Sequence, residues 1–134
     1  MRQFMMAVLA GLLLAANPAL AADAPREAAG APATLGEWIA RDRAMAALPP
    51  GPARDAELAS LHRAVVDGLQ AALAAEDAKV NAGQVSAACL PPPGTTELTS
   101  AEIGTWLQSR PTSEHGEPMQ QVLARFLSER FPCP

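Results

Sequence analysis

Cys89 and Cys133 are the two cysteines of this 134-residue sequence, and their thiols offer its widest choice of chemistry. A thiol can act as a nucleophile, bind a metal ion or form a disulfide. Nucleophilic catalysis needs a neighbouring base, but Cys133 lies between two prolines and follows no recognisable nucleophile turn. A zinc site needs four ligands, and His62 and His115 lack the close spacing that zinc sites show. Both chemistries are therefore weaker alternatives to a disulfide.

Glu114 and His115 form the other reactive pair, since a carboxylate beside an imidazole can transfer protons. They occur in the segment TSEHGE, for which a polar turn is the simpler interpretation. The sequence contains no GxSxG, HExxH, glycine-rich phosphate loop or CxxC motif. We therefore predict a protein that is not an enzyme and that binds no cofactor and no metal.

The first residues indicate the cellular compartment in which the two cysteines are located. Arg2 precedes an uncharged apolar run from Phe4 to Ala16, and Ala19-Leu20-Ala21 has the small-x-small pattern that signal peptidase cleaves. We predict a signal peptide over residues 1–21, cleavage after Ala21 and a periplasmic mature protein. A membrane anchor is the alternative, but the run is shorter than the roughly 18 apolar residues that span a bilayer.

Export places the thiols in an oxidising compartment, where two cysteines usually pair. The predicted disulfide joins Cys89 to Cys133. Closing a loop of about 45 residues stabilises a fold by roughly 3–4 kcal/mol, mainly by restricting the unfolded chain. This is a large contribution for a domain of this size.

The segments that must position the two cysteines are helical. Residues 22–33 are rich in Ala, Pro and Gly without periodicity, which predicts a disordered leader before a single domain at residues 34–134. Capping boxes at Thr34–Glu37 and Thr99–Glu102, together with the prolines, predict helices near 34–48, 55–81, 99–110 and 118–131. No segment alternates with period two. The predicted fold class is all-α, a small bundle of about four helices tied by one disulfide.

The second predicted helix is the longest, and its apolar stripe comprises Leu58, Leu61, Val65, Leu69, Ala72 and Leu73. Gly68 lies beside this stripe, where glycine costs a helix roughly 1 kcal/mol relative to alanine. We therefore expect another backbone to approach closely there. His62 borders the stripe and is predicted to be a partly buried packing residue. Trp38 and Trp106 lie on apolar helix faces and are predicted to belong to the core.

An ordered set of features runs through the C-terminal part of the sequence. Cys89 is followed by a turn at Pro91–Gly94, a short helix from Trp106 to Pro111, a turn with His115, and a last helix that closes on Phe131-Pro132-Cys133. This set of about 45 residues resembles the Rap/Tai family of periplasmic immunity proteins. The N-terminal part departs from that family, because the second cysteine pair that the family usually carries is missing and His62 stands at one of its positions.

The resemblance implies an all-helical periplasmic protein, often a homodimer, that neutralises a peptidoglycan amidase delivered by the type VI secretion system. It would bind the secreted amidase and cover its active-site cleft. The partner-binding residues implied are two turns held rigid near the disulfide, Pro92-Pro93-Gly94 and Glu114-His115-Gly116. A net charge of −4 without a basic run disfavours nucleic acid as a partner, and no segment after the signal peptide is predicted to enter a membrane.

Two other functions agree with a short, exported, helical chain that has one disulfide. A small periplasmic acid-stress chaperone would unfold at low pH and expose apolar surface. An exported accessory protein would have no inhibitory role.

Overall fold

The computed structural model describes residues 30–134, so the predicted signal peptide and all but the last residues of the predicted leader lie outside the described part. The described chain forms the helices α1 (Leu35–Ala46), α2 (Pro52–Asn81), α3 (Ser100–Gln108) and α4 (Met119–Arg130), with a short 3-10 helix, η2 (Thr112–Glu114), before α4. No strand occurs among these residues, which contain a single isolated bridge between Thr34 and Pro118. The predicted small all-α bundle is confirmed.

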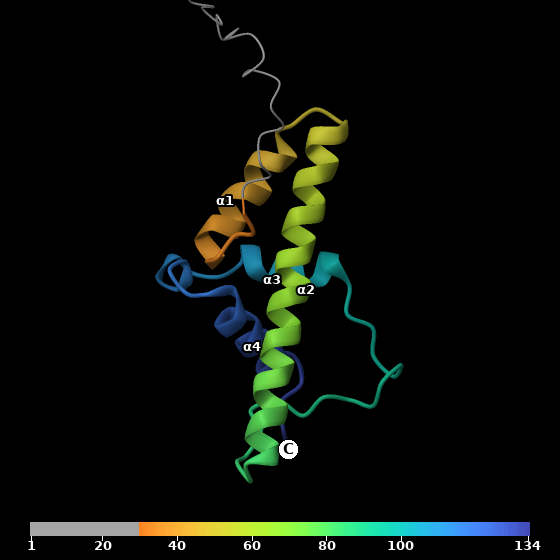
Figure 1. Ribbon diagram of the computed structural model, residues 1–134, viewed down its shortest axis with the longest axis vertical. Helices are drawn as coiled ribbons and strands as arrows, with labels where there is room; N and C mark the ends of the chain where they lie inside the picture. The colour runs from red at the N-terminus through yellow and green to blue at the C-terminus, as the bar shows by residue number, and fades with distance from the viewer. Residues whose placement is uncertain (1–29) are drawn as a thin grey trace, which may run out of the picture.

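The long helix α2 is the axis of the molecule (Figure 1). α1 lies along the N-terminal half of α2, and α4 packs against its middle and C-terminal part. α3 crosses α2 and contacts α1. The segment between α2 and α3 makes a wide excursion to one side before the chain returns to the bundle.

Threonine hydroxyls start two of the helices, as the sequence predicts. Thr34 Oγ1 accepts a hydrogen bond from the Glu37 backbone amide at 3.3 Å, and Thr99 Oγ1 accepts one from the Glu102 amide at 3.1 Å. Each bond satisfies an amide that has no partner inside the helix. The reciprocal half of the second capping box is absent, because the Glu102 carboxylate pairs with Arg130 at 2.7 Å.

α2 begins earlier than predicted. The predicted start near residue 55 is wrong, because α2 starts at Pro52 and Asp55 lies in its first turn. Proline suits the first helical position because its fixed φ is helical and its missing N–H would have no helical partner. At the other end Gly83 adopts a φ of +76°, and the Gln84 amide donates to the Lys79 carbonyl at 2.9 Å. This is the Schellman arrangement that commonly ends helices, so the predicted stop is confirmed.

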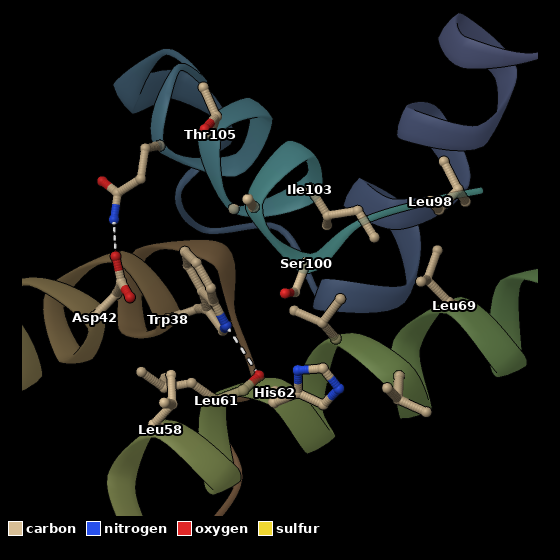
Figure 2. A pocket seen from close by; sticks show the side chains of 15 residues that line it. Trp38, Asp42, Leu58, Leu61, His62, Leu69, Leu98, Ser100, Ile103 and Thr105 are labelled. Carbon is tan, nitrogen blue, oxygen red and sulfur yellow. Dashed lines mark hydrogen bonds between the residues drawn. The ribbon is translucent and has the colours of Figure 1, made fainter. Parts of the chain in front are cut away.

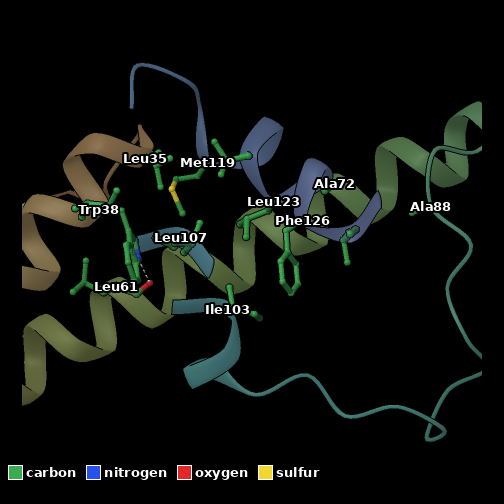
Figure 3. Packing of buried hydrophobic residues seen from close by; sticks show 14 of the residues in the cluster. Leu35, Trp38, Leu61, Ala72, Ala88, Ile103, Leu107, Met119, Leu123 and Phe126 are labelled. Carbon is green, nitrogen blue, oxygen red and sulfur yellow. Dashed lines mark hydrogen bonds between the residues drawn. The ribbon is translucent and has the colours of Figure 1, made fainter. Parts of the chain in front are cut away.

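The core lies where all four helices meet (Figure 3). Its largest fully buried side chains, all less than 2% exposed, are Leu35, Leu61, Leu107, Val122, Leu123 and Leu127. Trp38 is buried as predicted, and its indole Nε1 donates to the Leu61 carbonyl at 3.2 Å. Trp106 is half-buried at the edge, with its ring packed edge-on against Phe126 at 5.2 Å between centroids.

Small residues form the innermost face of α2. The buried positions of this helix are Leu61, Ala64, Gly68 and Ala72, whereas the larger Val65, Leu69 and Leu73 lie at the flank. A Cβ at Gly68 would lie 2.5 Å from Leu123 Cδ1 and 3.7 Å from the Met119 carbonyl carbon of α4. α4 does approach α2 closely at Gly68, but the atom that a side chain would meet first is Leu123 Cδ1, and the Met119 backbone lies at ordinary contact distance.

The predicted burial of His62 is wrong. His62 is exposed, and Leu58, also assigned to the apolar stripe, is 53% exposed. The reason is where the neighbouring helices lie. α1 and α4 cover the face of α2 that carries Ala64 and Gly68, and the flank that carries His62 borders an open groove beside α3.

Candidate interaction surfaces

The segment that follows α2 is anchored at its beginning. The Glu76 carboxylate of α2 accepts hydrogen bonds from the Ser86 hydroxyl and the Ala87 amide, both at 2.9 Å, and from Lys79 Nζ at 2.7 Å. These contacts lower the pKa of Glu76 from 4.5 to about 2, Lys79 contributing most, followed by Ala87 and Ser86. The Glu76 side chain is 12% exposed, so this carboxylate holds the segment against α2 from a partly enclosed position.

The predicted disulfide is present and provides the next anchor. Cys89 and Cys133 are joined with a Cα–Cα distance of 4.8 Å, and the Cys89 amide donates to the Phe131 carbonyl at 2.9 Å. Both cysteines are thereby used, and no free thiol remains in residues 30–134. The bridge fixes the start of the excursion to the residues that follow α4.

Pro92, Pro93 and Gly94 form a tight turn that stands clear of the bundle (Figure 1). The Pro92 carbonyl accepts two hydrogen bonds from Thr95, one from the backbone amide at 3.2 Å and one from the side-chain hydroxyl at 2.6 Å. Gly94 has a φ of +81°. Proline at the second position and a positive-φ glycine at the third are the requirements of a type II turn. Pro92 to Thr95 are exposed, and a Cβ at Gly94 would meet no atom within 4 Å.

The other predicted turn, Glu114-His115-Gly116, is packed into the protein. The first amides of α1 donate to it, with Gly36 N bonded to the His115 carbonyl at 2.8 Å. A Cβ at Gly36 would lie 3.0 Å from that oxygen, so glycine permits this contact. His115 is half-buried, and the Glu114 carboxylate pairs with Arg125 Nη1 at 3.0 Å.

The Arg125 guanidinium completes this arrangement. It also binds Glu117 at 2.8 Å, and Glu117 first and then Glu114 raise the pKa of Arg125. The contacts that hold this turn come from α1 and from Arg125, and the expectation that the disulfide stiffens it stays a prediction. The two predicted turns also project from opposite sides of α2 in Figure 1, so they form no common surface.

A groove that the sequence analysis missed opens between α2 and α3, with α1 at one end (Figure 2). We call it the α2–α3 groove. Its volume is about 690 Å³, and its lining is predominantly apolar. Leu58, Leu61, Val65 and Leu69 line it from α2, and Trp38 and Ile103 contribute from α1 and α3. His62 points to the same space, and so does Ser100 at the start of α3.

Asp42 of α1 is the one acidic side chain among the residues that line the α2–α3 groove. Its Oδ2 accepts a hydrogen bond from Gln108 Nε2 of α3 at 2.5 Å, which closes one end of the groove (Figure 2). On the α3 side the lining residues include Ala101, Gly104 and Thr105, all of them small. The groove is thus wide and apolar, with a single carboxylate at one end.

Comparison of the chain with protein family models, with curated proteins and with solved structures gave no match in any of the three. Within residues 30–134 no cluster of three or more His, Cys, Asp or Glu side chains could hold a metal ion. In the same range no helix is both long and apolar enough to cross a membrane. The assignment of function therefore depends on the surfaces themselves.

The contacts of Glu76 predict a pH dependence of stability. Because the folded pKa of about 2 lies below the ordinary value of 4.5, ionised Glu76 stabilises the fold above about pH 4.5. This stabilisation is lost as the pH falls from 4.5 toward 2. Glu76→Gln should lower the free energy of unfolding by about 1–2 kcal/mol at neutral pH, with the difference from the wild type vanishing near pH 2.

Urea denaturation at a series of pH values measures this difference. The matched control is Asp77→Asn, which removes a neighbouring exposed carboxylate outside the Ser86–Ala87 contacts. A Glu76→Gln variant as stable as the wild type at neutral pH would show that the carboxylate does not hold the segment.

Proposed function

We propose that the protein is a periplasmic inhibitor that binds a peptidoglycan amidase delivered by the type VI secretion system, and that its type II turn at Pro92–Thr95 enters or covers the active-site cleft of the amidase. The observation that carries the proposal is this turn. It is exposed, closed by its own hydrogen bonds and anchored upstream by the disulfide. A protrusion that is ordered before binding loses little conformational entropy when a partner takes it up.

Further support comes from the chemistry around the turn. A disulfide requires an oxidising compartment, which agrees with the export predicted from residues 1–21. We place the main contact on Pro92–Thr95 and not on Glu114-His115-Gly116, because the Glu114 carboxylate and the His115 carbonyl are engaged within the protein. A charge reversal at Glu114 would disturb the ion pair with Arg125 as well as any partner contact, so this turn is a poor probe.

The test is inhibition of purified type VI amidases, measured as release of peptide from peptidoglycan. Gly94→Val is expected to weaken inhibition by about ten-fold or more, because a branched side chain disfavours a φ of +81°. Gly94→Asn is the matched control, since asparagine tolerates positive φ and should keep inhibition near the wild-type level. Circular dichroism checks that both variants fold.

Two results would contradict the proposal at different levels. If Gly94→Val inhibits as strongly as the wild type, the turn is not the contact. If no type VI amidase is inhibited by the wild-type protein at micromolar concentration, amidase inhibition is wrong.

One observation favours the acid-stress chaperone as a second candidate. Because the pKa of Glu76 in the folded protein is about 2, its protonation as the pH approaches 2 removes the charge that holds Ser86 and Ala87 to α2. The released segment carries Val85 and Leu90, which are 89% and 47% exposed and flank this anchor. A chaperone would suppress aggregation of a client protein near pH 2–3, and Glu76→Gln would shift that activity to higher pH. Unchanged circular dichroism and tryptophan emission down to about pH 2 would exclude this function.

A further inference from the structure

We propose that the α2–α3 groove docks an amphipathic helix of a partner protein, and that a lysine or arginine of this helix pairs with Asp42. The inference does not depend on amidase inhibition. It concerns a different surface from the Pro92–Thr95 turn, and it names a second kind of partner.

The first argument is the apolar surface that the groove leaves open. Leu58 and Val66 of α2 are 53% and 36% exposed, and both line the groove together with the partly buried Val65 and Leu69. Single exposed apolar side chains are common, whereas a contiguous set in a concave site marks a binding surface. Exposed Leu58 and Val66 lie two helical turns apart, so one apolar helix face can cover both.

The shape of the groove selects a helix. From Leu58 to Leu69 the α2 wall is about 16 Å long, which equals about three helical turns. Opposite, the small side chains of Ala101, Gly104 and Thr105 leave space for another helix at the usual axis separation of about 8–10 Å. An extended segment would leave its amides and carbonyls unpaired against these apolar walls, whereas a helix satisfies them internally.

The charge of the groove orients the helix. Asp42 is the one acidic side chain in its lining, and Gln108 Nε2 donates to one of its two carboxylate oxygens. A carboxylate has further acceptor capacity, so a cationic side chain at one end of the docked helix can pair with it. A helix with an apolar stripe and an acidic residue at this end would be disfavoured.

Two synthetic peptides of about 15 residues test the proposal directly. Both have leucine at helical spacing on an alanine-rich background, and they differ in a terminal residue of the stripe, which is lysine in one peptide and glutamate in the other. We expect the lysine peptide to bind about five-fold or more tightly than the glutamate peptide at low salt, with ¹H–¹⁵N shift changes confined to groove residues. Trp38 emission gives a second readout, because Trp38 lines the groove.

Two variants distinguish the contribution of the Asp42 charge to peptide binding from the contribution of the groove's shape. Asp42→Asn keeps an acceptor for Gln108 and should make the two peptides bind equally. Gly104→Leu should weaken both peptides by about ten-fold or more, because a side chain at this position enters the groove. A Cβ there would lie 3.8 Å from Trp38 Cη2, an ordinary contact, so the variant should fold. Val85→Asp alters an exposed apolar residue outside the groove lining and should leave binding unchanged.

Several outcomes would overturn the proposal. One is equal binding of the two peptides to the wild-type protein, and another is shift changes outside the groove. A third is self-association in sedimentation that Gly104→Leu abolishes, since a second copy would then be the occupant. Gly94→Val should bind the lysine peptide normally, so failure of amidase inhibition and failure of helix docking are distinguishable.

Discussion

Replacing both Cys89 and Cys133 by serine is expected to lower the free energy of unfolding by about 3–4 kcal/mol. The bridge joins residues 44 positions apart and encloses α3 and α4 in one covalent loop. Without it the unfolded chain regains the freedom that loop closure removed. The Cys89 amide bond to Phe131, the Glu76 contacts and the burial of Ala88 also hold the segment after α2, but none of them restricts the unfolded chain as the bridge does. Urea denaturation monitored by circular dichroism measures the change.

The serine variant also supplies the control. Wild-type protein should lose the same stability when a reductant is added, whereas the variant should not respond to the reductant. Equal denaturation midpoints for wild type and variant under oxidising conditions would show that the bridge adds nothing to stability.

Gly68→Leu is expected to destabilise the protein by about 3 kcal/mol, the upper part of the usual range for overpacking. Leucine has a better helix propensity than glycine, so a loss of stability can only come from packing. A Cβ at this position would lie 2.5 Å from Leu123 Cδ1, and Leu123 is fully buried. A leucine here must therefore displace Leu123 inside the contact between α2 and α4.

Gln70→Leu is the matched control, because it places the same side chain two positions further along α2 on the exposed face. It should change stability by less than about 0.5 kcal/mol. The double variant Gly68→Leu with Leu123→Ala should lose less than the sum of the single losses, since the smaller residue makes room for the larger one. Strict additivity would contradict a direct contact between the two positions.

Local signals explain the parts of the fold that were predicted. Thr34 and Thr99 start helices because each hydroxyl reaches an amide only three residues away. Gly83 ends α2 through its own backbone conformation. The disulfide followed from two cysteines and a predicted oxidising compartment, and the Pro92–Thr95 turn from prolines next to a glycine. The start of α2 was misplaced because Asp55 and Pro52 are both suitable near a helix start.

The parts of the fold that were not predicted depend on packing between segments far apart in the sequence. Local sequence patterns contain little information about such packing. Whether His62 is buried depends on where α3 crosses α2, which no pattern within α2 records. The pairing of Glu114 with Arg125 and the contacts of Glu76 with Ser86 and Ala87 join separate segments in the same way. One signal for the groove was present. Ala64, Gly68 and Ala72 recur every four residues, which places the tightest helix contact on the small side of α2 and leaves Leu58 outside it.

The disulfide has a consequence for how the molecule responds to proteolysis. The exposed turn at Pro92–Thr95 lies between the two bridged cysteines. A protease that hydrolysed a peptide bond in this turn would yield two fragments that stay covalently linked, with α1 and α2 on one and α3 and α4 on the other. Cleavage in this exposed turn therefore releases neither half of the molecule.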